Sequence, residues 1–437
     1  MNWRNRVIAT LAGGWLFSSG LAYPAEVQST PPNTSGASVL DWNAHAAQLI
    51  VGPGGAAKAP ALGLVDLAIV HTAIYDAVNA IEGFPFRTYA VTANVPGPAS
   101  GDAAVAAAGR GTLVALYPDR SADIEAWYAA SLAAVPDGEE ETNGVAVGEQ
   151  TAAAILALRA SDGRNAGTPI VEPTPGPGVW ERTPPALAAP LAPWVRFVTP
   201  WNLKLPSQFR PQPPPTLSSR KYRKDYEETR DFGGASGGLA TEEQQNIGRF
   251  WGDQPMLQWN RAWRGIALAR GLSGMDTARF FAMLSTATSD SLIACWDAKY
   301  EYLFWRPVTA IRAGGGDPRL TGDPSWSSLV TTPNHPEYPG AHGCLSGAAT
   351  STLESFFGTD WVRFTIDSNA AGVATPVRSY SKFSQAIEEV IDARVFGGMH
   401  YRSSSETGAR MGRQVAKRAA KAFRPAPAGD DRDDDQE

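Results

Sequence analysis

The sequence predicts an all-α protein: one or two large helical bundles, interrupted by a long proline-rich irregular segment. Three observations lead to this prediction. Apolar residues recur at the three-and-four spacing of a helix through most of the chain. Strand-like alternation is confined to short stretches such as WVRFTID. Proline is dense between residues 167 and 215, and a helix interior would not accept it there.

Composition limits the classes of protein and partner. The chain has 437 residues, 43% of them hydrophobic and 19% charged, which is enough for one large domain or two closely packed ones. Its formal net charge of -6 argues against a nucleic-acid partner, which normally meets a basic face. The partner we expect is a small molecule.

The N-terminus predicts a signal peptide over residues 1–22, because Arg4 and Arg6 precede a short apolar run that ends in small residues. The alternative, an uncleaved anchor, needs about 20 apolar residues, and this run is shorter. We therefore expect an exported protein, periplasmic or secreted, with no membrane span in its mature form.

Four regions are expected after the signal peptide. Residues 38–166 are predicted to be an N-terminal helical region, and 167–225 a proline-rich excursion whose tryptophans pack it onto the body. Residues 226–425 are predicted to be a C-terminal helical catalytic region, where Thr241 and Gln244 have the spacing of a capping box. Residues 426–437 read as an acidic disordered tail.

Three segments in the last third of the chain carry residue types suited to an oxyanion site. Lys299 and Arg306 are seven residues apart, which on one helix would place both cations on one face. A guanidinium fork and an ammonium together can hold a tetrahedral oxyanion. Taken alone, the same pair is also compatible with a solvated helix surface.

The second segment is PGAH, from Pro339 to His342, where small residues open a helix and backbone N-H groups can point at an anion. The third is ARVFGGMH, which supplies Arg394 and His400 on either side of a Gly-Gly break. Each has a plain alternative: a turn that merely enters a helix, or a cation pair near a helix end.

In chain order, these patterns resemble the three motifs of the vanadium-dependent haloperoxidases and of the acid phosphatases that share their site, in the type 2 phosphatidic acid phosphatase superfamily. Those motifs are K-x6-R-P, P-S-G-H and S-R-x-x-x-G-x-H-x-x-x-D. Trp296 and Pro333 stand where chloroperoxidase-like members line the vanadate pocket. The resemblance implies an all-helical core.

The resemblance also implies a role for each matched residue. Backbone and side-chain donors would hold the oxygens of vanadate, namely Lys299, Arg306, Gly340, Ala341 and Arg394. His400 would be the single protein ligand to vanadium, and His342 would act as acid-base toward hydrogen peroxide. The reaction would oxidise a halide to a hypohalous acid equivalent, with a small organic acceptor as a further partner. The implied cofactor is vanadate, so we expect no haem, flavin or zinc. A homo-oligomer is compatible with the sequence.

The sequence departs from the family pattern at three positions. Gly340 replaces the motif serine, Ala341 replaces the glycine, and Ser404 stands where the third motif has aspartate. In phosphatase members that aspartate orients the nucleophilic histidine, so its loss favours a haloperoxidase over an acid phosphatase working through phosphohistidine. A third reading is a non-catalytic member that binds oxyanions.

Other residues sharpen or limit this reading. His335 stands seven residues before His342. At this position the fungal chloroperoxidases share an aromatic residue, whereas the algal bromoperoxidases have histidine. This resemblance implies that bromide and iodide are favoured as substrates. The alternative is a loop histidine in solvent.

The remaining candidate residues are more plainly structural. His71 reads as a hydrogen-bonded core histidine, and Asp76 and Asn79 could brace a buried arginine. Cys295 and Cys344 allow one bridge or two small buried residues.

Overall fold

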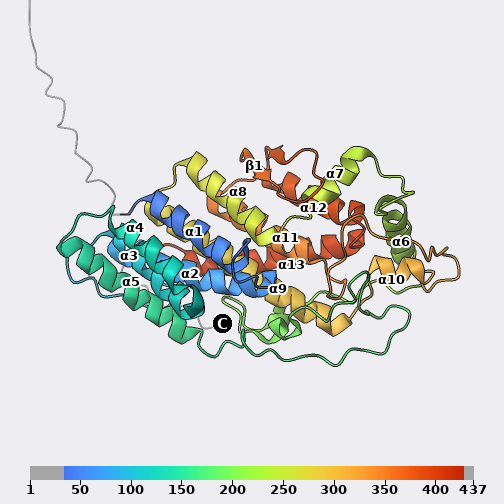
Figure 1. Ribbon diagram of the computed structural model, residues 1–437, viewed down its shortest axis with the longest axis horizontal. Helices are drawn as coiled ribbons and strands as arrows, with labels where there is room; N and C mark the ends of the chain where they lie inside the picture. The colour runs from blue at the N-terminus through green and yellow to red at the C-terminus, as the bar shows by residue number, and fades with distance from the viewer. Residues whose placement is uncertain (1–33, 428–437) are drawn as a thin grey trace, which may run out of the picture. The chain divides into compact units, whose positions relative to one another are not determined.

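The structure, a computed structural model, describes residues 34–427. The predicted signal peptide and residues 428–437 of the predicted tail lie outside this range. The described residues belong to one compact unit of α-helices with one antiparallel pair of short strands, β1 (Phe364–Asp367) and β2 (Val377–Tyr380) (Figure 1). The predicted all-α class is confirmed, and the WVRFTID stretch contains β1.

The helices run in chain order as α1 (Gly36–Val51), α2 (Pro60–Ile81), α3 (Gly101–Leu116), α4 (Ser121–Leu132), α5 (Glu139–Leu158), α6 (Arg220–Phe232), α7 (Glu242–Phe250), α8 (Pro255–Arg270), α9 (Gly274–Tyr302), α10 (Pro307–Arg312), α11 (Ala341–Phe357), α12 (Phe383–Phe396) and α13 (Arg402–Ala419). The capping box predicted at Thr241 and Gln244 is present and opens α7.

Helix α2 lies at the centre of the N-terminal half. Pro60 occupies its first turn, where a missing N-H costs nothing, and residues 61–80 are all buried against α1, α3, α5 and α9. Within residues 34–427 it is the one helix long and apolar enough to cross a membrane by composition, but its whole apolar window is covered by protein. It is therefore built as the core helix of this unit.

Helix α9 carries the first functional segment, and its end corrects one prediction. Leu303, at a φ of +46°, caps α9 three residues before Arg306, which in turn caps the N-terminus of α10. Lys299 and Arg306 therefore do not share a helix face. The pair is brought together instead by the loop from His335 to Pro339, which both side chains contact.

Helices α11 and α13 make the most extensive helix pair in the unit because small residues let their backbones come close. A Cβ atom on Gly343 would lie 2.3 Å from the carbonyl oxygen of Ser405, and one on Gly408 would lie 2.4 Å from the carbonyl oxygen of Gly340. This packing fixes the PGAH turn at the start of α11 against the first turn of α13, directly after His400.

The proline-rich excursion packs along α9 and the site loop. It contains short 3-10 turns at Pro193–Phe197 and Pro206–Phe209, and Trp180 within it is fully buried. The indole N-H of Trp296 donates to the carbonyl of Leu191 over 3.1 Å. Helix α6 begins at Arg220, inside the last residues of the predicted 167–225 range.

Candidate active site

Lys299 is fully buried on the last turns of α9, and its ammonium is held by the backbone of the HPEYPGAH loop. Its Nζ donates to the carbonyl oxygens of Pro336 at 2.7 Å, Glu337 at 3.0 Å and Pro339 at 2.5 Å. Burial lowers the pKa of Lys299 to about 8. The lysine thus fixes the loop between its two prolines as well as placing a positive charge beneath it.

Arg306 joins the first and third motifs. Its guanidinium donates to the carbonyls of His335 at 2.9 Å and Met399 at 2.8 Å, and it also lies 3.0 Å from His400 Nε2. Another of its nitrogens lies 3.0 Å from His335 Nδ1. Burial lowers the pKa of Arg306 to about 10, so the group remains charged at neutral pH.

A carboxylate that the sequence did not reveal orients His400. Oε1 of Glu337 lies 3.0 Å from His400 Nδ1 and accepts the N-H of Tyr401, while Oε2 accepts the Ser404 hydroxyl at 2.6 Å. Because Arg306 donates to Nε2, that nitrogen carries the lone pair and Nδ1-H donates to Glu337. Burial raises the pKa of Glu337 to about 7.

This contact corrects an argument made from the sequence. Serine at position 404 was expected to leave His400 without a carboxylate, but Glu337 supplies one from the second motif. The Ser404 hydroxyl donates a hydrogen bond to the Glu337 carboxylate and so helps to hold it against His400. The contact joins residues 63 apart in the chain; the only sequence signal was an acidic residue inside a loop of otherwise stiff or small residues.

Arg394 enters the site from the end of α12. One guanidinium nitrogen donates to the carbonyl of Trp251 at 2.9 Å, a second contacts Met399 Sδ at 2.9 Å, and Nε is buried without a partner. Burial, and then the charge of Arg306, lower the pKa of Arg394 to about 9. An unpartnered buried donor is uncommon and indicates a position prepared for an acceptor.

His342 lies in the first turn of α11 with its Nε2 buried and unpartnered. Burial, and then the charges of Arg394, Arg306 and Lys299, hold the pKa of His342 well below its ordinary value. The imidazole is therefore neutral at neutral pH. It lines a pocket of 380 Å³ together with Ala341 and Arg394.

The predicted backbone donors differ from each other. The N-H of Gly340 donates to the carbonyl of Ser404 at 2.9 Å and is already used, which corrects the prediction that it faces an oxyanion. The N-H of Ala341, in the first turn of α11, is left as the candidate donor. A Cβ on Gly340 would lie 3.0 Å from Ser405 Cα, so the motif serine would be crowded here.

The predicted halide-tuning residues all line the 380 Å³ pocket, namely Trp296, Pro333 and His335. The rings of Trp296 and His335 are 5.0 Å apart between centroids, and His335 is 5% exposed. His335 is therefore not a loop histidine in solvent. Burial and the charges of Lys299 and Arg306 hold its pKa well below the ordinary value.

The charges in this cluster suit an anion of the vanadate type. Three buried cations, Lys299, Arg306 and Arg394, face Glu337, the one carboxylate bonded to the cluster within residues 34–427, which leaves a surplus of two positive charges. Buried uncompensated charge is costly unless a counter-ion completes it. With the unpartnered Nε-H of Arg394 and the unpartnered Nε2 of His342, the residues present fit a tetrahedral oxyanion.

The two cysteines lie beside this cluster, because Cys295 Sγ contacts the same Pro339 carbonyl as Lys299. Cys295 and Cys344 are both fully buried free thiols, and their sulfur atoms are 2.8 Å apart. They join α9 to α11 by contact, four residues before Lys299 on α9 and two residues after His342 on α11.

Comparison with known proteins agrees with this geometry. Residues 279–427 match the family described as the VCPO second helical-bundle domain. The relation to vanadium-dependent haloperoxidases predicted from the three motifs is thereby confirmed, and the matched range holds Trp296, Lys299, Arg306, His342, Arg394 and His400.

Similar proteins extend the likeness beyond this segment. A segment of 96 residues is 30% identical to vanadium chloroperoxidase of Curvularia inaequalis, and it spans 20% of this chain and 15% of that protein. A bacterial vanadium-dependent iodoperoxidase has the same fold over 92% of this chain and 100% of its own, with a TM-score of 0.78 at 24% identity. A holo-type bacterial vanadium-dependent chloroperoxidase covers 86% of this chain and 94% of its own, with a TM-score of 0.66 at 19% identity.

Proposed function

We propose that this protein is a vanadate-dependent haloperoxidase that uses hydrogen peroxide to oxidise bromide or iodide. The observation that carries the proposal is the buried cluster of Lys299, Arg306 and Arg394 around His400. Unpartnered nitrogens of Arg394 and His342 lie beside it, and both residues line the pocket. In the overall reaction, the O-O bond of peroxide breaks, the halide loses two electrons, and hypohalous acid and water form with uptake of one proton.

Each residue has a part in holding the cofactor. The three cations and the N-H of Ala341 would neutralise the vanadate oxygens, and His400 Nε2, which carries the lone pair, would be the ligand to vanadium. Bound vanadate supplies a Lewis acid that makes a peroxide oxygen electrophilic toward halide. Glu337 acts as a positioning residue, because its bond to Nδ1-H keeps His400 in the tautomer that presents Nε2.

His342 is the proposed acid-base residue. An imidazole kept neutral by burial and by three neighbouring cations is ready to accept a proton from hydrogen peroxide. In the free site the imidazole is thus in the form of a base, and not in the form of the acid that would protonate a leaving alcohol.

Glu337 keeps the acid phosphatase as a second candidate. A carboxylate on Nδ1 raises the basicity of His400 Nε2, which is also what a phosphohistidine mechanism requires. Phosphate and vanadate have the same shape and charge, so the cation cluster accepts either. A non-catalytic oxyanion-binding protein is the third and least favoured reading, because both histidines and all three cations are in place.

Two assays on the purified full chain separate the three candidates. The first follows bromination of an activated diketone with peroxide, with and without vanadate, and the second follows phosphate release from a simple monoester without vanadate. We expect bromination that depends on vanadate. Phosphate release, with no bromination at saturating vanadate, would show that the protein is a phosphatase. Failure of both assays would indicate the non-catalytic oxyanion-binding protein.

Halide choice, acceptor and location complete the proposal. His335 in the wall of the pocket supports a preference for bromide and iodide over chloride. The pocket would admit halide and peroxide, and a small organic acceptor meets the oxidised halogen there or beyond it. We also propose that the protein is exported, on the basis of the signal-like N-terminal sequence.

A further inference from the structure

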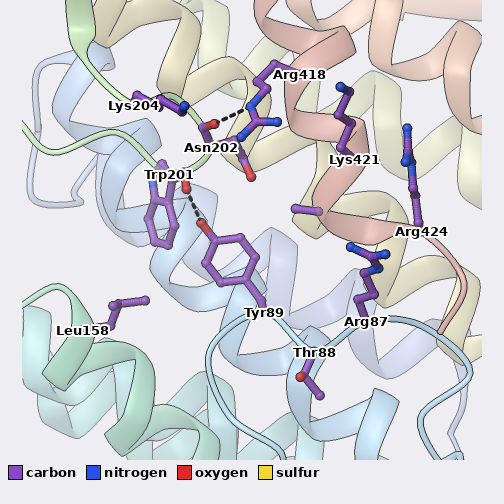
Figure 2. A pocket seen from close by; sticks show the side chains of 11 residues that line it. Arg87, Thr88, Tyr89, Leu158, Trp201, Asn202, Lys204, Arg418, Lys421 and Arg424 are labelled. Carbon is purple, nitrogen blue, oxygen red and sulfur yellow. Dashed lines mark hydrogen bonds between the residues drawn. The ribbon is translucent and has the colours of Figure 1, made fainter. Parts of the chain in front are cut away.

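A second cluster of cations surrounds a pocket of 860 Å³ that none of the predicted site residues lines (Figure 2). Five basic side chains surround it, contributed by three separate stretches of the chain: Arg87, Lys204, and the group Arg418, Lys421 and Arg424. No aspartate or glutamate is among the lining residues that the structure describes. A hollow lined by one sign of charge concentrates ions of the opposite sign.

Buried polar groups of α2 build one wall. Asp76 accepts the backbone N-H groups of Tyr89 at 2.6 Å and Ala90 at 2.8 Å, and Asn79 pairs with the backbone of Phe86. The hypothesis that Asp76 and Asn79 brace a buried arginine is therefore wrong. They pin the segment that carries Arg87, whose N-H also donates to the carbonyl of Arg424 at 3.0 Å.

A buried carboxylate of α9 builds the opposite wall. Asp290 accepts the N-H groups of Trp201 at 2.6 Å and Asn202 at 2.8 Å. The Tyr89 hydroxyl donates to the carbonyl of Trp201 at 2.7 Å and so ties the two walls together, and Arg418 Nε donates to the carbonyl of Asn202 at 3.2 Å (Figure 2). The pocket is thus held open by buried bonds before any ligand arrives.

Four of the five cations that line this pocket have no carboxylate partner among the residues that the structure describes. Lys204, Arg418, Lys421 and Arg424 make no ion pair with a carboxylate in residues 34–427, whereas elsewhere arginines such as Arg110 and Arg210 are paired within 3.0 Å. The contrast is marked in a chain whose formal net charge is -6. Leu158, 58% exposed, adds an apolar edge to the same rim.

We propose that this pocket binds a small anion carrying several linked phosphate groups, either an inorganic polyphosphate or an organic phosphate. The cations come from three stretches of the chain around the pocket, so a single tetrahedral anion would reach only part of them, while a linear chain of phosphates reaches several at once. The site is separate from the halide-oxidising centre and does not depend on the function proposed for it.

Calorimetric titration of the full chain with tripolyphosphate tests the proposal, with vanadate saturating to occupy the cation cluster around His400. We expect binding that survives vanadate and weakens as salt rises, because exposed charges are screened. The double variant K421E/R424E should weaken it by about 10-fold or more. Repeating the titration with ATP distinguishes the sources, since an organic ligand that uses Leu158 binds more tightly than tripolyphosphate alone.

The matched control is R413E/K417E, which changes two exposed cations of α13 outside the pocket and lowers the net charge by the same four units. It should leave tripolyphosphate affinity nearly unchanged, and melting temperatures verify that both variants fold. Equal losses in the two variants, absence of binding by the wild type, or displacement by vanadate would overturn the proposal.

A further variant addresses the acidic end of the chain, with asparagine at Asp430, Asp431, Asp433, Asp434 and Asp435. Affinity equal to that of the wild type supports a site for a free anion. Binding seen only in this variant would instead assign the pocket to the chain's own acidic residues and overturn the proposal.

Discussion

His71 and His400 are two buried histidines with different surroundings. Both are 1% exposed or less, and burial is the main reason that each pKa is lowered. His71 Nε2 lies 2.8 Å from the Asn43 amide, and its Nδ1 has no partner. His400 has Glu337 at one ring nitrogen and Arg306 at the other. The sequence-based interpretation of His71 as a hydrogen-bonded core residue is confirmed.

The comparison teaches that burial alone does not prepare a histidine for chemistry. His71 is stacked against Phe281 inside a helical core, where a neutral ring is simply packed. His400 is buried equally, but two charged partners fix its tautomer and orientation next to a pocket. The bonds to the ring, and not its exposure, distinguish the two sites.

The largest expected effect is that of removing the ring of His400. His400→Ala should lower vanadate-dependent bromination on the order of 10³-fold, because the lone pair meant for the cofactor is lost. His71→Gln, which keeps an acceptor for Asn43, should leave the bromination rate unchanged. Equal losses in both variants would show that the two histidines do not differ in the way described.

The second effect concerns Glu337. Glu337→Ala should weaken vanadate affinity, measured by thermal-shift titration, and lower the bromination rate by about 10-fold to 100-fold, as removal of partners behind a metal ligand does. The double variant E337A/S404D returns a carboxylate to the position used by the family motif, and it should recover most of the loss. A purely structural role for Glu337 predicts no recovery in E337A/S404D.

The third effect is on stability and separates His71 from catalysis. Burial lowers the pKa of His71 to about 3, below the unfolded value of about 6.5, so its neutral ring stabilises the fold fully above pH 6.5. That stabilisation is lost as the pH falls toward 3. Between pH 7 and pH 5 the loss lowers the free energy of unfolding by about 2 kcal/mol. Urea unfolding at pH 7 and pH 5 measures this loss. The fall in the free energy of unfolding between the two pH values should be about 2 kcal/mol smaller in His71→Gln than in the wild type.

The smallest effect is expected at His335, which bonds to Arg306 without contacting His400 by a hydrogen bond. His335→Phe installs the aromatic ring of chloroperoxidase-like members and should raise the chloride-to-bromide rate ratio by about 10-fold. Steady-state rates with each halide measure it. A wild-type bromide rate no greater than its chloride rate would already refute the assignment of His335 to halide choice.

The helical fold and the motif residues could be predicted from the sequence because both depend on short spacings. Apolar periodicity within α2 and α9 is local, and so is the order of charged residues inside each motif. The relation of Lys299 to Arg306 could not be predicted correctly, since Leu303 ends α9 between them. Their meeting depends on a loop more than 28 residues further along the chain.

Glu337 shows most clearly what sequence reasoning misses. Its role follows from the placement of a loop against His400 and Ser404, more than 60 residues away. The same applies to the pocket lined by Arg87 and Arg424, whose walls come from distant segments. Tertiary packing brings the charges of such clusters together, so residue spacing along the chain does not predict them.

The close packing of Gly340 on α13 also couples the two histidine-bearing segments mechanically. A serine at 340 would place its Cβ 3.0 Å from Ser405 Cα and 3.3 Å from Ser405 N, both of them backbone atoms. The first turn of α13 would therefore have to move by a few tenths of an ångström to admit the serine. Because α13 begins two residues after His400, a substitution in the turn before His342 would be transmitted to the segment that carries the other histidine.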